Sequence, residues 1–284
     1  MAAGIVDAHH HLWDLGVRDQ DWITGAALAP LRRDFLLGDY QPLAGQNGVV
    51  ASVVVQTVTV PGETPELLEL AATSDLIAGV VGWADLTAPG LADQIAELTV
   101  RPGGDKLVGL RHQVQNEPDP QWLTRADVLR GLAAVAGAGL AYDLVITAGQ
   151  LPAAARAAAA VPDLLFVLDH LGKPAIASES TQPWERDLRR LAALPNTAGK
   201  LSGLVTEADW TGWQVADLRP YADIALDAFG PGRLMFGSDW PVCTLAASYG
   251  EVLQAARDLT GHLSDAEREA IFAGTATRLY RLQR

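Results

Sequence analysis

The sequence predicts a (β/α)₈ barrel, and three observations support that prediction. Eight short apolar runs recur along the 284 residues, and helical patterns fall between them. The runs are rich in Val, Ile and Leu and barely alternate with polar residues, as strands that are covered on both faces do. Strands alternating with helices indicate a parallel sheet, and eight such units across about 240 residues have the size of one barrel. Residues 1–284 are therefore expected to form a single domain.

The expected strands are bounded by turn residues or by helical patterns. They are Ile5–His9, Val49–Thr57, Ile77–Ala84, Val108–Gln113, Leu140–Ile146, Leu164–Asp169, Ala198–Ser202 and Leu234–Gly237. The seventh is weak on its own and is supported by its position in the series. A doubly wound open sheet is the alternative, but no Gly-x-Gly-x-x-Gly follows the first run, which argues against the dinucleotide-binding form of that fold.

The expected helices have apolar residues at helical spacing, and glycines end or follow several of them. They are Pro65–Ser74, Gly90–Leu98, Ala126–Ala138, Leu151–Ala160, Trp184–Ala193, Leu218–Phe229, Tyr249–Leu259 and Ser264–Leu282. The longest connection, Leu12–Gly48, precedes the second strand. Because long loops on enzyme barrels commonly cover the site, we expect this segment to act as a lid.

Composition excludes several classes of function. The chain is 49% hydrophobic and carries 21 basic and 34 acidic residues, a net charge of −13, which argues against binding to nucleic acid or to anionic membranes. The single cysteine, Cys243, rules out an intrachain disulfide. No signal peptide and no apolar stretch of about 18 residues are recognised, so a soluble cytoplasmic protein is expected. The sequence leaves open whether it forms a homo-oligomer.

Titratable residues gather where the predicted strands end, and this is where barrel enzymes carry their active sites. Five of the six histidines lie there, in three different strands, which is hard to explain as core filling because buried polar groups are costly unless they are paired or used. These histidines are His9, His10, His11, His112 and His170.

The segment Asp7-Ala8-His9-His10-His11 is the strongest single signal. A period of two predicts that Asp7, His9 and His11 share one face of the strand. Two imidazoles at this spacing can meet one metal, and imidazole suits zinc, iron or nickel. Asp239, after the last strand, would complete the site or serve as a base. A histidine held in the core for structure is the competing interpretation.

The remaining candidates follow from the same strand-end argument. Asp239, His170 and Arg111 are the expected catalytic residues. Structural alternatives stay open for three residues: Asp239 could cap a helix, His170 could be held beside a carboxylate for structure, and Lys200 could lie along a barrel rim. The expected substrate-binding residues are Gln56, Trp83, His112, Tyr142, Lys173, Lys200 and Trp240.

Five segments, in order along nearly the whole chain, resemble the amidohydrolase superfamily, and more narrowly its amidohydrolase-related branch, which includes sugar-lactone hydrolases of the fucono- and rhamnonolactone type. The matching segments are Val6-Asp7-Ala8-His9-His10-His11-Leu12-Trp13-Asp14, Gly109-Leu110-Arg111-His112-Gln113-Val114-Gln115-Asn116-Glu117, Leu168-Asp169-His170-Leu171-Gly172-Lys173-Pro174, Lys200-Leu201-Ser202-Gly203-Leu204 and Met235-Phe236-Gly237-Ser238-Asp239-Trp240-Pro241-Val242.

The resemblance implies a distorted barrel that hydrolyses an ester or amide with an activated water. It implies His9, His11 and Asp239 as metal ligands and His170 as the histidine of the sixth strand. Members with two metals need a bridging carboxylate at the end of strand four, where this chain has Arg111 and His112. One divalent metal, with zinc favoured, is therefore expected, and an enzyme that needs no metal is the alternative.

The function hypothesis is hydrolysis of a small sugar-acid lactone, with this small molecule as the binding partner. Asp239 would take a proton from water, while His170 and Arg111 face the developing oxyanion. Three alternatives stay open: hydrolysis of dicarboxylate or sulfo-muconolactone-type lactones, metal-dependent decarboxylation, and binding of a sugar acid without turnover. Only one arginine, Arg111, is placed at the site, which favours neutral lactones.

Overall fold

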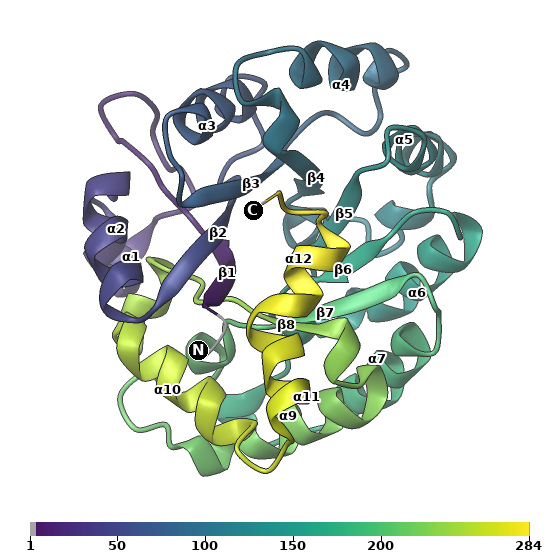
Figure 1. Ribbon diagram of the computed structural model, residues 1–284. Coiled ribbons are helices and arrows are strands. Elements are labelled where there is room, and N and C mark those ends of the chain that lie inside the picture. The colour runs from purple at the N-terminus through teal and green to yellow at the C-terminus, as the bar shows by residue number, and fades with distance from the viewer. Residues whose placement is uncertain (1–3, 284) are drawn as a thin grey trace.

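Eight parallel strands form a nearly closed barrel, surrounded by helices, in the computed structural model of this protein, which describes residues 4–283 (Figure 1). The strands pair in chain order from β1 to β8, so each helical connection returns the chain to the next parallel strand. The (β/α)₈ prediction is confirmed, and each predicted strand overlaps an observed one. The strands are β1 Ile5–His10, β2 Val49–Val55, β3 Ile77–Gly82, β4 Leu107–His112, β5 Ala141–Leu144, β6 Phe166–Leu168, β7 Thr197–Leu201 and β8 Leu234–Phe236.

The outer helices bury their apolar faces against the barrel, and seven of the eight predicted helices match observed ones within three residues at either end. The helices are α1 Gly25–Leu28, α2 Leu37–Gln46, α3 Glu63–Ala72, α4 Leu91–Thr99, α5 Ala126–Gly137, α6 Leu151–Ala160, α7 Trp184–Ala192, α8 Leu204–Glu207, α9 Val215–Phe229, α10 Tyr249–Leu259, α11 Asp265–Glu269 and α12 Thr275–Leu279. The helix expected over Ser264–Leu282 is observed as a continuous helical run over Asp265–Leu279, but a wide π-turn at Ala270–Gly274, which the sequence pattern did not predict, divides it into α11 and α12. No helix within residues 4–283 has the length and apolar character needed to span a membrane.

The first strand contains a bulge that corrects one sequence-based expectation. Its register against β2 shifts between Asp7 and His10. As a result Asp7 does not share a face with His9 and His11. Asp7 instead accepts hydrogen bonds from Tyr40 and Tyr249, on helices α2 and α10 outside the barrel. A bulge interrupts the alternation of side chains between the two faces of a strand, because its extra residue moves the following side chains to the other face.

The barrel closes between β8 and β1 through individual hydrogen bonds. The backbone N–H of Asp239 donates to the carbonyl of His9 at 2.8 Å, and the N–H of His11 donates to the carbonyl of Trp240 at 2.6 Å. The carboxylate of Asp7 adds two bonds from Ser238, one from its N–H at 2.8 Å and one from its hydroxyl at 2.6 Å. The residues that close the barrel thus include or adjoin the candidate site residues His9, His11 and Asp239.

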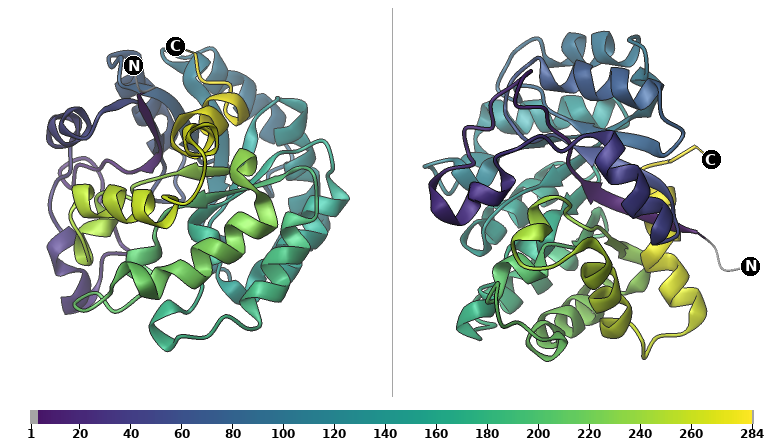
Figure 2. Two further views of the ribbon diagram at one scale, coloured as in Figure 1. Left: turned by 60° about the horizontal axis from the view of Figure 1, so that its bottom comes forward. Right: turned by 90° about the vertical axis from the view of Figure 1, so that its left-hand side faces the viewer.

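The two ends of the barrel are covered differently. The C-terminal segment crosses the end that faces the viewer in Figure 1, and Ala273, Ala276 and Tyr280 pack with the small apolar residues inside the barrel. In the right-hand view of Figure 2 both chain ends lie on the right, while much of the long connection between β1 and β2, in purple, lies on the left. The carboxyl ends of the strands, opposite the C-terminal segment, are the end available for a site.

Candidate active site

A cavity of about 500 Å³ opens at the carboxyl ends of the strands. It is lined by residues that follow seven of the eight strands, β3 being the exception, and by three residues of the β1–β2 connection. The latter are Asp21, Trp22 and Leu28, so the long connection forms part of the wall, as the lid prediction requires. The other lining residues are His11, Thr57, Val58, Thr59, Arg111, His112, Gln113, Gln115, Asn116, Glu117, Val145, His170, Lys173, Thr206, Glu207, Trp210, Asp239, Val242 and Leu245.

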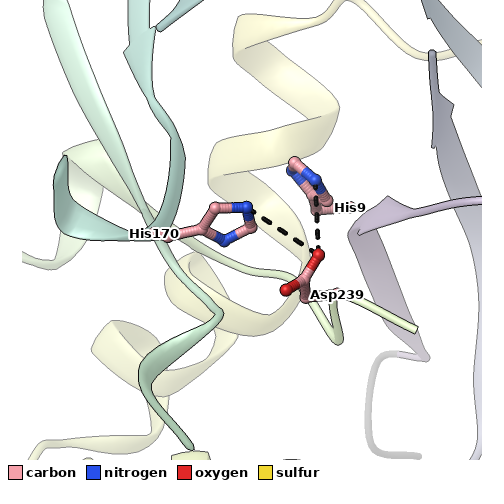
Figure 3. Close-up of side chains that lie close together, drawn as sticks. All are labelled: His9, His170 and Asp239. Carbon is pink, nitrogen blue, oxygen red and sulfur yellow. Dashed lines mark ion pairs between the residues drawn. The ribbon is translucent and has the colours of Figure 1, made fainter. Parts of the chain in front are cut away.

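Three histidines converge on one carboxylate at the floor of this cavity. Oδ1 of Asp239 lies 3.4 Å from Nε2 of His11 and 3.8 Å from Nε2 of both His9 and His170. The two histidines of the first strand are 3.1 Å apart between their Nε2 atoms. Figure 3 shows His9 and His170 reaching Asp239 from different elements. The structure therefore brings together all four residues that the sequence predicted for the centre of the site.

Burial and mutual attraction set the charges of this cluster. Burial lowers the pKa of His170 to about 4, against the pull of Asp239. Burial, reinforced by the ammonium of Lys200, also holds the pKa of His9 well below its ordinary value. For Asp239, burial alone would raise the pKa, but His170, His11 and His9 outweigh it and the pKa lies well below its usual range. At neutral pH the site thus presents the ionised carboxylate of Asp239 beside the neutral imidazoles of His9 and His170.

This donor set fits one divalent metal ion. His11 uses Nδ1 to donate to the carbonyl of Val55 at 2.8 Å, so its Nε2 keeps a lone pair that faces Nε2 of His9. In a tetrahedral zinc site with bonds of about 2.0–2.1 Å the ligand atoms lie roughly 3.3 Å apart. The separations of 3.1–3.8 Å match that spacing. His9, His170 and Asp239 form a group whose ligand atoms all lie within 4.8 Å, so His170 is a candidate ligand besides its predicted catalytic role.

Two glycines are required by the close packing around the histidines. A Cβ on Gly237 would lie 2.6 Å from Cβ of His9, and one on Gly203 would lie 2.5 Å from Nδ1 of His170. Gly203 also has a φ of +64°, a conformation that favours glycine. Asp239 and His170 themselves have positive φ values of 57° and 51°. Such backbone strain is typical of functional sites, where the surrounding structure imposes it.

Arg111 lies beside the cluster and is tightly held. Its Nε donates to the side-chain oxygen of Gln56 at 2.9 Å, and its Nη2 donates to the Gln56 carbonyl. Its Nη1 donates to Asp169 at 2.9 Å and lies 3.4 Å from Nε2 of His9. The guanidinium is therefore fixed at the cavity wall, in a position from which it can face an oxyanion.

Two of the residues predicted to bind substrate line the cavity. His112 accepts a hydrogen bond from the indole of Trp83, stacks on Trp122 and lies 2.7 Å from Glu117 through Nε2. Since Nδ1 accepts, Nε2 is the atom that donates to Glu117. Lys173 lies 3.9 Å from Glu207 across the cavity.

The other five predicted substrate-binding residues do not line this cavity, and the structure places each of them against other protein groups. Gln56 is buried and holds Arg111, while Trp83 lies behind His112. Tyr142 faces the helices, because its neighbour Asp143 takes the inward position on β5. Trp240 packs against Phe35 and Tyr40. Lys200 is fully buried inside the barrel, behind His9.

Several lining residues were missing from the predicted set. Thr57 and Gln113 are the last residues of two predicted strands, so the strand-end rule could have included them. Glu207 and Trp210 lie in or just after α8, a short helix without a periodic pattern. Nothing in the sequence near them marks the cavity, which is assembled from loops far apart in the chain.

Comparison with known proteins agrees with this geometry. The amidohydrolase family model matches residues 6–282. The chain belongs to the amidohydrolase family. It is 46% identical to an L-fucono-1,5-lactonase of Burkholderia multivorans, over 99% of this chain and 97% of that protein, and 35% identical to an L-fucono-1,5-lactonase of Burkholderia ambifaria, over 98% and 96%. The resemblance found in the sequence is therefore confirmed.

A solved structure shows the same architecture for this amidohydrolase. The crystal structure of an amidohydrolase from Burkholderia multivorans with bound zinc superposes with a TM-score of 0.92, at 45% identity, over 99% of this chain and 100% of that one. The barrel and its strand order are thus those of an experimentally determined relative.

Proposed function

We propose that this amidohydrolase opens the ring of a neutral sugar lactone, with L-fucono-1,5-lactone as the leading substrate. The observation that carries the proposal is the full-length similarity to two L-fucono-1,5-lactonases in a chain whose own His11, His170 and Asp239 line an open cavity, with His9 directly behind them. A place in carbohydrate metabolism and a cytoplasmic location are part of the same proposal.

The charges of the cavity support a neutral, hydroxyl-rich substrate. Its lining has four carboxylates, Asp21, Glu117, Glu207 and Asp239, against two permanent cations, Arg111 and Lys173. Both cations are already paired, Arg111 with Asp169 at 2.9 Å and Lys173 with Glu207 at 3.9 Å. Threonines, glutamines and an asparagine supply neutral hydrogen-bonding groups along the rest of the wall. A dianionic ligand would meet like charges there, whereas sugar hydroxyls would find donors and acceptors.

The chain's own residues suffice to orient the reaction. The ionised carboxylate of Asp239 accepts a proton from the attacking water. Arg111 and neutral His170 lie on the same floor and would donate to the oxygen that gains charge as water adds to the carbonyl. Asp239 then returns its proton to the ring oxygen as the bond to the acyl carbon breaks. The product is a hydroxy acid, whose carboxylate can pair with Lys173.

We propose His9, His11 and Asp239 as ligands of one zinc ion, which leaves His170 free to donate to the oxyanion. When bound, such an ion lowers the pKa of a coordinated water from about 15.7 towards about 7 and polarises the carbonyl. Neutral imidazoles and an ionised carboxylate are the protonation states that metal binding requires.

Removal of the metal should abolish most of the activity. We expect dialysis against a strong chelator to lower kcat at least about a hundredfold, because the water then loses its main activation. Added zinc should restore the rate in proportion to zinc bound. Full activity in protein that elemental analysis finds free of metal would contradict the metal proposal.

Of the alternatives that the sequence left open, the comparisons favour none over sugar-lactone hydrolysis. Dicarboxylate lactones are disfavoured by the acidic lining described above. Decarboxylation would release carbon dioxide and no new acid group. Pure binding would leave Asp239 without a use.

A panel of substrates tests the proposal through acid release in weak buffer. We expect neutral aldono-1,5-lactones to exceed a dicarboxylate lactone in kcat/KM by at least about a hundredfold, since like-charge contacts cost several kcal/mol. Neutral 1,4-lactones test ring size in the same assay, and a carboxylated phenol tests decarboxylation. Faster turnover of the dicarboxylate lactone or of the phenol would refute the assignment.

A further inference from the structure

A buried lysine lies directly behind the histidine cluster and has no part in the reaction described above. Lys200, on β7, is fully buried. Its Nζ lies 2.5 Å from Oδ2 of Asp143, 3.0 Å from Oδ1 of Asp169 and 3.0 Å from Nδ1 of His9. The sequence predicted that it would bind substrate, but it reaches the site only through His9.

The C-terminal segment completes this network from the other end of the barrel. The hydroxyl of Tyr280, just after α12, contacts both carboxylate oxygens of Asp143, at 2.9 and 2.7 Å. Asp143 in turn holds Lys200, and Arg111 contacts the second oxygen of Asp169 at 2.9 Å. The chain of contacts thus runs from Tyr280 through Asp143, Lys200 and Asp169 to His9.

The orientation of the His9 ring depends on these contacts. Its Nδ1 lies 3.2 Å from Oδ1 of Asp169, while its Nε2 faces His11 and Asp239. Nζ of Lys200, which can only donate, lies 3.0 Å from the same Nδ1. Asp169 and Lys200 thus hold the Nδ1 edge of the ring from behind and leave its Nε2 edge facing the site. Carboxylates in this position commonly fix the tautomer of a metal-binding histidine. Lys200 is the cation that holds Asp143 and Asp169 side by side in the barrel, where two unpaired carboxylates would be costly.

We propose that Lys200 is a positioning residue: with Asp143 and Tyr280 behind it, Lys200 holds Asp169 and the Nδ1 edge of His9 in place, so that His9 presents its Nε2 beside His11 and Asp239. The importance of this Nε2 rests on the zinc-dependent function proposed above. The readouts of the proposal are zinc affinity and a histidine NMR signal, which need no lactone and separate its failure from that of the proposed function.

Variants of Lys200 test the proposal in the full chain. Lys200→Met removes the ammonium but leaves two buried carboxylates and is at risk of unfolding. The double variant Lys200→Met/Asp143→Leu removes one buried charge of each sign and should fold. We expect zinc affinity, measured by competition with a chromophoric chelator, to fall about 10- to 100-fold in the double variant, the range typical of residues that support metal ligands. With the enzyme saturated in zinc, kcat should fall while KM stays within about threefold, because Lys200 does not line the cavity.

A matched control is available on the outside of the barrel. Lys106 is half-buried and donates to two backbone carbonyls, those of Ala71 and Ser74, away from the site. Lys106→Met should lower stability without changing zinc affinity by more than about twofold. Zinc affinity of the folded double variant within twofold of the wild-type value would overturn the proposal.

The wild-type protein supplies a measurement that does not depend on any variant folding. In protein labelled with ¹⁵N-histidine and loaded with zinc, His9 should carry its proton on Nδ1, protected from exchange by Asp169. A His9 ring protonated on Nε2 under these conditions would also overturn the proposal.

Discussion

Replacement of Asp239 by asparagine should lower kcat for a sugar lactone by about a thousandfold or more, the upper part of the range for loss of an acid–base group. The amide keeps the shape of the side chain but cannot take a proton from water at neutral pH. It also weakens the attraction between this position and the three histidines that approach Oδ1. We expect the loss in kcat, measured by acid release at saturating substrate, because the carboxylate acts on the reacting water.

An exposed carboxylate provides the control for this variant. Asp93 lies on α4, is exposed and does not line the cavity. Asp93→Asn should retain full activity, and circular dichroism should show both variants folded. Activity of Asp239→Asn within threefold of wild type would show that Asp239 is not the base.

Replacement of Asp7 by alanine should destabilise the fold by about 3–5 kcal/mol, a large value for one substitution. The Asp7 carboxylate is fully buried and accepts from the Ser238 N–H and hydroxyl and from the hydroxyls of Tyr40 and Tyr249. Each buried donor left without an acceptor costs about 1–3 kcal/mol, although such costs do not add fully. Because Ser238 precedes Asp239, loosening of this contact should also reduce the activity of the folded fraction. Urea unfolding measures the change in free energy.

The variant Asp7→Asn serves as the comparison. Its side-chain oxygen can still accept from the backbone N–H groups of Ser238 and His9, and the hydroxyls can turn to accept from the amide. It should therefore lose less than half of what alanine loses. If Asp7→Ala unfolds within about 1 kcal/mol of wild type, the carboxylate is not the group that holds the closing strands together.

The strands and the centre of the site could be predicted because their signals are local. Short apolar runs determine where strands form, and His9, His11, His170 and Asp239 follow such runs directly. Their convergence then follows from the geometry of a parallel barrel, whose strands all end at the same edge.

The errors concern properties that depend on pairing between distant segments. The bulge that turns Asp7 outwards arises from the register of β1 against β2. On β5 either Tyr142 or Asp143 could point into the barrel. An apolar run that is buried on both faces does not show which of the two does so. Lys200 could not be placed behind His9 without its partners, since Asp143, Asp169 and Tyr280 come from three other parts of the chain.

The most direct test of the account is the initial rate of proton release from L-fucono-1,5-lactone by purified, zinc-loaded protein, corrected for spontaneous hydrolysis. The account predicts catalysed ring opening with a kcat/KM of at least about 10⁴ M⁻¹ s⁻¹, the lower end of the usual range for enzymes. A rate equal to the spontaneous one, in folded protein with zinc bound, would contradict it.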